Sequence, residues 1–192
     1  MRRSTWVRIV GMIGCLAPLV VVSAADEPFQ TSVRLAGPLG PVDPMIYGQY
    51  VEHVDAGDEC VYPSICAPGR PGTDADGLRL DVMDLVRELG PPVVRWPGGC
   101  FADVYHWERG IGPRASRPVT PNGHWKGTTE NHQFGTNEFL RWCEQTGMKP
   151  YINVNLGSGT LEEALRWVEY CNGGPETPQG RRRAADGRVE PY

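Results

Sequence analysis

Short β-branched runs alternate with amphipathic stretches along residues 46–172, and this order constrains the fold more than any other feature of the sequence. The pattern predicts strands over 45–51, 93–96 and 151–155, and helices over 78–89, 137–146 and 161–171. The last of these helices follows Thr160, with Glu163 three residues further on, which is a capping-box pattern. Strands that alternate with helices pair in parallel through right-handed crossovers. We therefore expect an α/β fold of about three βα units.

Long loops follow the predicted strands, whereas the connections after the helices are short. The two longest loops are 55–77, which is rich in Gly, Pro and Asp, and 97–134, which carries several His and Trp residues. Loops of this length in a compact domain are usually functional or disordered. A working face at one end is typical of a (β/α)8 TIM barrel, which takes roughly 250 residues when complete. We expect residues 46–172 to form a truncated, N-terminal part of such a barrel.

Composition excludes several other classes of protein. The formal net charge of -4 and the absence of a basic face interleaved with aromatic residues argue against nucleic-acid binding. The 24 glycines and 18 prolines make up less than a quarter of the chain, below the roughly 25–30% that indicates disorder. The stretch 157–160 lacks the Lys of a phosphate-binding loop. A globular, loop-rich protein without a cofactor is the expectation.

The N-terminal residues have the pattern of a secretory signal peptide. Three arginines precede the apolar run 9–22, which ends in small residues at 23–25. The run is shorter than the ~20 residues that a spanning helix needs. A Gly-Cys pair at 14–15 is a weaker indication of a lipoprotein. We expect a signal peptide over 1–25, export to the periplasm or medium, and no membrane attachment after cleavage.

Two further segments flank the predicted barrel part. Residues 26–45 contain one short alternating piece, 32–35, followed by several prolines and glycines. This composition predicts an edge strand and a linker. Residues 173–192 are rich in Gly, Pro and Arg and have no apolar period. They are expected to form a solvated loop that leads towards a fourth strand.

Five cysteines remain after the predicted signal peptide: Cys60, Cys66, Cys100, Cys143 and Cys171. Because the number is odd, at least one thiol stays unpaired in an exported protein. Cys60 and Cys66 share a loop and could form a disulfide, whereas Cys143 and Cys171 are on predicted helices and are expected to be buried. A zinc site from His53, Cys60, Cys66 and His106 would match no common spacing of structural zinc ligands. No metal is therefore expected.

The stretch 93–113 is the best candidate for a functional loop. A buried strand ends at Arg95 and Trp96, and Pro97, Gly98 and Gly99 then predict a tight bend that lets backbone approach a ligand. Cys100 and several aromatic residues follow, and aromatic residues beside an arginine suit a sugar. The alternative is that Arg95 is a structural ion-pair partner and the aromatic residues belong to the core. The first predicted strand also ends on polar groups, Glu52 and His53.

Six short sequence motifs together resemble those of the α-L-arabinofuranosidases of glycoside hydrolase family 51. In chain order, from about Ile46 to Asn172, they are GQYVEH, RWPGGCF, NGHWKG, QFGTNEF, NVNLGSGT and WVEYCN. The resemblance implies that the full-length form is a retaining glycosidase. Such an enzyme releases terminal non-reducing α-L-arabinofuranosyl residues from arabinan, arabinoxylan or their oligosaccharides. The resemblance also allows a homo-oligomer of the full-length form.

The resemblance assigns substrate-binding roles to four residues. Glu52 would hydrogen-bond the arabinose, and Arg95 would hold the carboxylates of the site in place. Cys100 would line the sugar subsite, and Trp125 would cover the pocket. A supporting role in the floor of the site falls to Asn155. An ordinary packing role is the alternative for each of them.

Catalytic residues are not expected in this chain. In the family, the acid/base is the Glu of an Asn-Glu pair that ends the fourth strand, and the nucleophile ends the seventh, whereas only three strands are predicted here. The Asn137-Glu138 pair opens a helix, where an acidic residue complements the helix dipole, so its expected role is structural. The alternatives are a non-catalytic carbohydrate-binding fragment that uses Glu52, Arg95 and Trp125, or another (β/α)8 glycosidase.

Overall fold

The computed structural model describes residues 32, 37, 40–53, 64–125 and 127–192. The chain divides into two compact units, residues 1–40 and 41–192, and all helices and strands of the described residues belong to the second. The predicted signal peptide and nearly all of the predicted strand 32–35 lie outside the described residues, so both stay predictions. No helix in the described ranges is long and apolar enough to cross a membrane.

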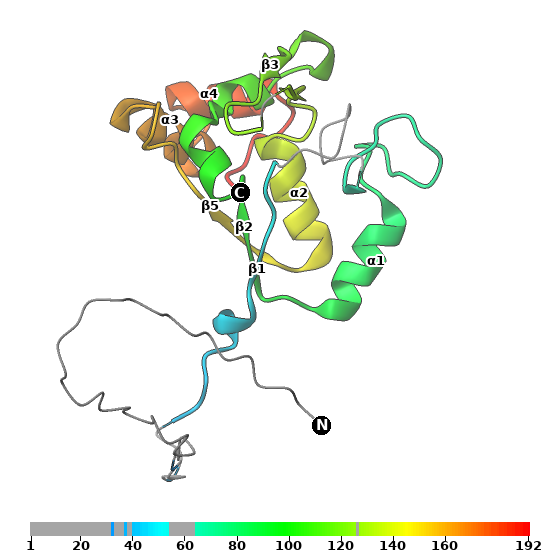
Figure 1. The fold of residues 1–192 in the computed structure, drawn as a ribbon. Coiled ribbons are helices and arrows are strands. Elements are labelled where there is room, and N and C mark those ends of the chain that lie inside the picture. Colours follow the sequence, from blue (N-terminus) through cyan, green and yellow to red (C-terminus); the bar gives the residue numbers. More distant parts are fainter. Residues whose placement is uncertain (1–31, 33–36, 38–39, 54–63, 126) are drawn as a thin grey trace, which may run out of the picture. The chain divides into compact units, whose positions relative to one another are not determined.

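A three-stranded parallel sheet lies at the centre of the second unit (Figure 1). Its strands are β1 (Gln49–Tyr50), β2 (Val93–Trp96) and β5 (Lys149–Ile152), and their order in the sheet is their order in the chain. Both pairs of strands are parallel, with Tyr50, Arg95 and Tyr151 side by side in register. The expected α/β class with parallel strands is confirmed.

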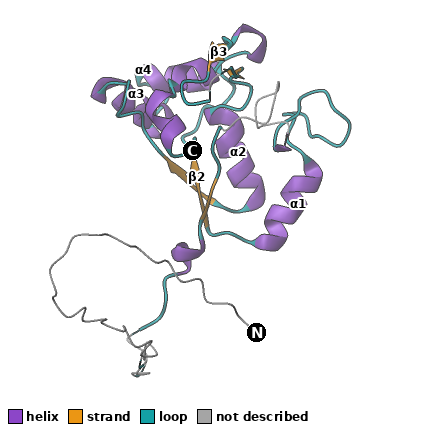
Figure 2. Ribbon diagram, viewed as in Figure 1, coloured by secondary structure: helices purple, strands orange, loops and turns teal. Residues whose placement is uncertain are grey.

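Helices connect the strands and continue beyond them (Figures 1 and 2). The helix α1 (Leu80–Leu89) precedes β2, α2 (Thr136–Thr146) precedes β5, and α3 (Leu161–Asn172) and α4 (Pro178–Ala185) follow β5. Helix α1 packs against α2, and α3 packs against α4. Four short 3-10 helices and a small antiparallel pair complete the described structure: η1 (Pro44–Tyr47), η3 (Cys100–Val104), η4 (Trp107–Gly110), η5 (Arg114–Ser116), β3 (Thr120–Pro121) and β4 (Thr129–Glu130).

The two faces of the sheet differ in what covers them. Val94 and Trp96 are buried, and the Trp96 ring stacks on Phe139 of α2 with 4.9 Å between centroids. Because successive residues of a strand point to opposite faces, Arg95 lies on the other face. Its neighbours in register there, Tyr50 and Tyr151, are 59% and 56% exposed. The helices therefore cover one face, and the face that carries Arg95 is open, as the interior face of an incomplete barrel would be.

The core between the helices and the loop after β2 is mainly aromatic. Trp167 of α3 stacks on Trp107, with 6.0 Å between ring centroids, and meets the edge of Trp96 at 5.8 Å. Two indole N–H groups have partners inside this core: Trp167 Nε1 donates to Thr136 Oγ1 at 3.0 Å, and Trp107 Nε1 donates to the Glu163 carbonyl at 3.1 Å. Buried indoles usually need such partners. The core thus fixes α2, α3 and the loop relative to the sheet.

Most predicted elements are present, with shifted ends. Residues 93–96 form a strand with the predicted bounds, and Thr160 caps α3, its Oγ1 accepting from Glu163 N at 3.1 Å. Residues 45–51 were expected to be one strand, but η1 replaces its first half, because Asp43 caps a turn that begins with Pro44. Helix α1 begins two residues later than predicted, and β5 begins two residues earlier.

The prediction for the start of α2 is wrong in one detail. Thr136 directly precedes the predicted helix 137–146, and its residue type predicts an N-cap there. The cap is instead Gly135, whose N–H donates to Glu138 Oε2 at 2.8 Å. The Thr136 hydroxyl accepts from the Trp167 indole instead. The Thr136 hydroxyl therefore binds a side chain of α3 instead of capping α2 as local sequence had predicted.

The prediction of a solvated loop over 173–192 is also wrong, because this segment contains α4. Thr177 caps the helix, with Oγ1 accepting from Gly180 N at 3.0 Å, and Pro178 is the first helical residue. Arg183 is fully buried and donates to the carbonyls of Tyr170, at 2.7 Å, and Val189, at 2.8 Å. The helix docks through an arginine rather than through an apolar stripe, so a search for apolar periodicity missed it.

Replacing Arg183 by Leu should destabilise the protein by about 2–4 kcal/mol, because two buried carbonyls would lose their donor. Denaturant unfolding followed by circular dichroism measures this loss. The matched control is Arg181→Leu, an exposed position on the same helix, which should change the free energy of unfolding by less than about 1 kcal/mol. Equal losses for the two variants would contradict the assignment of Arg183 as an anchor of α4.

Candidate functional site

The candidate site lies beyond the carboxyl ends of β1, β2 and β5. Backbone hydrogen bonds continue past the assigned strands: Val51 N to Arg95 O at 2.9 Å, His53 N to Pro97 O at 3.2 Å, and Asn153 N to Trp96 O at 2.8 Å. These bonds bring the segments that follow the three strands to one edge of the sheet. In α/β barrels, the strand ends on this side face the active site.

Glu52 is held by the loop that follows β2. Its Oε1 accepts from the backbone N–H groups of Gly99, at 2.9 Å, and Phe101, at 3.1 Å. No hydrogen bond to Oε2 is present within the described part of the chain. The carboxylate is therefore held through one oxygen, and the other has no hydrogen-bond partner among the described residues.

The Gly98-Gly99 bend is shaped around this carboxylate. Gly98 has φ +143°, and a Cβ on it would lie 2.3 Å from Glu52 Cγ, so only glycine fits. Its carbonyl accepts from Asn153 Nδ2 at 2.7 Å, which ties the bend to the end of β5. The Trp96–Pro97 peptide bond is cis. The close backbone approach predicted for a ligand is made, in this structure, to Glu52.

Arg95 and Glu52 flank the same glycine. A Cβ on Gly99 would lie 3.9 Å from Arg95 Nη2, and 3.5 and 4.0 Å from the two oxygens of Glu52. The guanidinium lies over the Tyr50 ring, 5.1 Å from its centroid, in cation–π contact. Among the described residues it has no hydrogen-bond or ion-pair partner, and its Nε is buried. The alternative interpretation of Arg95 as a structural ion-pair partner therefore has no support in the described structure.

The cysteines follow the prediction in part. Cys100, directly after Gly99, is a free and exposed thiol, in agreement with the expectation that at least one thiol is unpaired. Cys66 is free and buried, so the disulfide considered between it and Cys60 is not formed; Cys60 itself lies outside the described residues. Burial raises the pKa of the Cys66 thiol to about 11. Cys143 and Cys171 are buried free thiols, as expected.

Trp125 lies in the turn of the β3–β4 hairpin, partly buried against the core. Its N–H donates to Asn122 Oδ1 at 3.3 Å, and Asn122 Nδ2 donates to the His53 carbonyl at 3.1 Å. The hairpin is therefore attached to the residue that follows Glu52. The substrate roles of Glu52, Arg95, Cys100 and Trp125 stay predictions.

His53 belongs to a buried polar chain that the sequence did not reveal. Its Nδ1 lies 2.6 Å from Glu130 Oε2, and Trp96 Nε1 donates to its Nε2 at 3.0 Å. Because an indole nitrogen only donates, Nε2 is the acceptor and Nδ1 carries the proton towards Glu130. Burial lowers the pKa of His53, against the opposing influence of Glu130, and so keeps the ring neutral. Glu130 was visible in the sequence only as one acidic residue in a long loop.

The zinc ligands considered from sequence do not converge. His53 is engaged with Glu130 and Trp96, and His106 Nδ1 lies 3.0 Å from Glu163 Oε1. In the described ranges no three His, Cys, Asp or Glu side chains are arranged to hold a metal ion.

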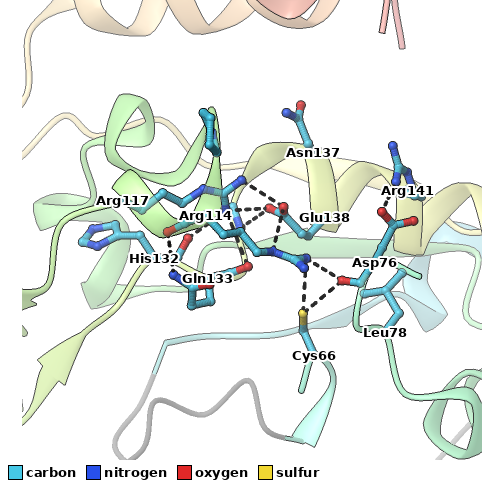
Figure 3. Close-up of polar contacts among 12 residues, drawn as sticks. Cys66, Asp76, Leu78, Arg114, Arg117, His132, Gln133, Asn137, Glu138 and Arg141 are labelled. Carbon is cyan, nitrogen blue, oxygen red and sulfur yellow. Dashed lines mark hydrogen bonds and ion pairs between the residues drawn. The ribbon is translucent and has the colours of Figure 1, made fainter. Parts of the chain in front are cut away.

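Glu138 has the structural role that was expected for it (Figure 3). Its two oxygens accept from Arg117 Nη2, at 2.9 Å, and Nη1, at 3.0 Å, and Arg114 Nε lies 3.4 Å from Oε1. Such bidentate pairs satisfy both charged groups. The adjacent Asn137 Oδ1 accepts from the Tyr170 and Tyr192 hydroxyls. Both side chains of the Asn-Glu pair are thus used to hold loops and helices together.

Most of the aromatic residues after Gly99 are core residues rather than sugar contacts. Phe101, Tyr105 and Trp107 are buried, so for them the packing interpretation is correct. Asn155 forms hydrogen bonds to the backbone. Its Oδ1 accepts from the N–H groups of Gly157, Ser158 and Gly159, and its Nδ2 donates to the Tyr105 carbonyl. It shapes the loop after β5, and its supporting role in the floor of the site stays a prediction.

The fold and the strand-end site together define part of a (β/α)8 barrel. The family model of the "Alpha-L-arabinofuranosidase 1 domain" matches residues 85–192, more than half of the chain. The chain belongs to this family, the α-L-arabinofuranosidases of glycoside hydrolase family 51. The expected resemblance and the expected partial barrel are both confirmed.

Similar proteins support this assignment. "Probable alpha-L-arabinofuranosidase C" of Aspergillus fumigatus is 46% identical over 161 residues, which are 84% of this chain and 31% of that protein. The "Intracellular exo-alpha-L-arabinofuranosidase" of Bacteroides ovatus is 45% identical over 148 residues, 74% of this chain and 27% of that protein. The chain therefore spans less than a third of the length of these relatives.

Solved structures agree with the sequence comparison. The family 51 α-L-arabinofuranosidase of Thermotoga petrophila superposes with a TM-score of 0.73 at 44% identity, over 79% of this chain and 31% of that one. The family 51 enzyme of Bifidobacterium longum gives 0.74 at 42% identity, over 80% and 30%.

Replacing Gly98 by Ala should destabilise the protein by about 2 kcal/mol or more, because the new Cβ would meet the Glu52 side chain in a backbone conformation that alanine disfavours. Gly99→Ala is the matched control, since its φ is -92° and its Cβ would be in ordinary contact at 3.5 Å. Thermal or denaturant unfolding of both variants tests the difference. A Gly98→Ala protein as stable as Gly99→Ala would show that the bend is not built around Glu52.

Stability should fall as the pH is lowered from about 7 to 5. Burial lowers the pKa values of His53 and His132 in the folded state, whereas in the unfolded chain both titrate near 6.5. Their contribution is therefore complete above that value and is lost as the pH falls towards the folded pKa values. Urea unfolding at several pH values measures the slope. His132→Asn should reduce it, because Asn tolerates the left-handed φ of +56° and does not titrate here; an unchanged slope would contradict this account.

Proposed function

We propose that this chain supplies the substrate-binding strand ends of an exported glycosidase that releases terminal non-reducing α-L-arabinofuranosyl residues from arabinan or arabinoxylan. The observation that carries the proposal is that the Glu52 and Arg95 side chains both lie next to Gly99. One carboxylate oxygen and one guanidinium remain available there within the described structure. Sugar hydroxyls both donate and accept hydrogen bonds, so such a pair suits them. The names of the relatives agree with this class of substrate.

In this proposal, the two catalytic carboxylates belong to the part of the barrel that residues 1–192 do not include. A retaining glycosidase needs two carboxyl groups about 5–5.5 Å apart. Glu130, Glu138 and Glu163 are each committed to a His or Arg partner, and Glu52 is held by two backbone N–H groups. In our proposal Glu52 binds the sugar, and Arg95 orients the carboxylates that perform general acid–base and nucleophilic catalysis. Cys100 lines the same pocket, and Trp125 covers it.

Residues 1–192 alone should not hydrolyse an aryl α-L-arabinofuranoside, because neither the general acid nor the nucleophile is assigned to them. The same chain continued to the length of its relatives should do so by a retaining mechanism. In that longer protein Arg95→Ala should lower kcat/KM by about 10²–10³, as expected when an electrostatic support is removed. Release of the chromophore measures the three activities, and the anomeric configuration of the first arabinose released, followed by NMR, tests retention.

The control is Arg109→Ala, an exposed arginine on η4, which should leave kcat/KM within about twofold. Turnover by the purified short chain would show that one of its own carboxylates is catalytic. Sugar binding without turnover by the longer protein would instead support a carbohydrate-binding function.

A further inference from the structure

The β3–β4 hairpin is attached to the end of β1 at a single residue, His53. Asn122, directly after β3, donates from Nδ2 to the His53 carbonyl at 3.1 Å. Glu130, the last residue of β4, binds the His53 ring through Oε2 at 2.6 Å. The hairpin strands are only two residues long, and an isolated pair of this kind is marginally stable. These two tethers, together with the packing of Trp125 against the core, therefore hold it in place.

His53 offers a rigid point of attachment. Its N–H donates to the Pro97 carbonyl, its Nε2 accepts from the Trp96 indole, and its ring stacks on Phe101 with 4.6 Å between centroids. The residue before it is Glu52. The tethers therefore end one residue away from the proposed sugar ligand.

Asn122 connects this point directly to the backbone of Trp125. Its Oδ1 accepts from the N–H groups of His124, at 3.1 Å, and Trp125, at 3.3 Å. On the other side of the turn, the Trp125 carbonyl accepts from the Thr128 hydroxyl at 2.7 Å. One side-chain amide thus links the backbone of Trp125 to the backbone of His53.

Glu130 fixes the returning strand with both of its oxygens. While Oε2 binds His53, Oε1 accepts from the His132 N–H at 2.7 Å. His132 has φ +56°, a left-handed conformation that is uncommon for residues other than glycine. Its ring nitrogen also lies 2.9 Å from the Pro118 carbonyl, so the base of the hairpin is held on both strands.

We propose that Asn122 and Glu130 are positioning residues that hold Trp125 at a fixed place relative to Glu52, by binding the hairpin to His53. The proposal rests on the proposed function for the roles of Trp125 and Glu52 in sugar binding. If Trp125 is already in position before the substrate binds, no binding free energy is used to order it. The affinity for the substrate is therefore higher. Loss of a tether should therefore raise KM more than it lowers kcat.

The test uses the full-length protein and the variant Asn122→Asp. This change keeps the Oδ1 acceptor of the turn but replaces the Nδ2 donor by an oxygen that faces the His53 carbonyl. We expect KM for an aryl arabinofuranoside to rise about tenfold, with less than about a threefold fall in kcat. Glu130→Gln leaves one acceptor oxygen for the two N–H donors, His53 Nδ1 and His132 N, so it should act in the same direction.

The matched control is Glu163→Gln. It breaks the other carboxylate–imidazole pair, between Glu163 and His106, which has no bond to the hairpin. KM should stay within about twofold of the unmodified protein. A rise equal to that of Asn122→Asp would overturn the proposal, because any loosened pair would then have the same effect.

A double-mutant cycle shows whether Asn122 acts through Trp125. In a Trp125→Ala background, Asn122→Asp should change KM by less than about twofold. A rise that is still about tenfold in that background would overturn the proposal.

Hydrogen exchange separates this inference from the proposed function. Asn122→Asp should speed amide exchange across residues 122–128, whereas Glu163→Gln should not. Unchanged exchange overturns the inference, whether or not the protein cleaves arabinofuranosides. If the unmodified full-length protein cleaves none, the proposed function falls, and exchange alone then decides whether the tethers hold the hairpin.

Discussion

The burial of Trp96 at the end of β2 connects the core to the candidate site. Its ring packs on Phe139 of α2 and Trp167 of α3, which fixes both helices against one face of the sheet. Its indole N–H donates to His53, which orders the end of β1. Because strand residues alternate between faces, this burial also places Arg95 on the open face. Core packing and site geometry therefore depend on the same side chain.

Buried polar groups act together with the aromatic packing of Phe101, Tyr105 and Trp107 to join the loops to this frame. Glu130 binds His53, Glu138 binds Arg117, and Arg183 binds two backbone carbonyls (Figure 3 shows the Glu138 cluster). Each of these groups has specific hydrogen-bond partners, as a buried charge requires. The polar contacts therefore add to the aromatic core in holding the loops in a defined conformation beside the strand ends.

Apolar residues remain exposed on the outer side of α3 and at the edge of the sheet. Leu161, Leu165 and Val168 share one face of α3 and are all more than half exposed. Near them, a cavity of about 130 Å³ is lined by residues of β5, the segment after it and α3, including Ile152, Val154 and Trp167. In a (β/α)8 barrel the next strand and helix pack at this place. This agrees with relatives that are about three times as long as the region they share with this chain.

The sequence by itself determined the βα order, the strand over residues 93–96, the cap at Thr160 and the family, because these depend on local periodicity, local capping or contiguous words. It also identified the strand ends that carry Glu52 and Arg95. Only the tertiary structure decided that Phe101, Tyr105 and Trp107 are core, that Glu130 binds His53 across 77 positions, and that residues 178–185 form a helix docked through Arg183. The physical reason is that the partners in a buried hydrogen bond or ion pair are chosen by distance in space, for which residue type and local spacing give no signal.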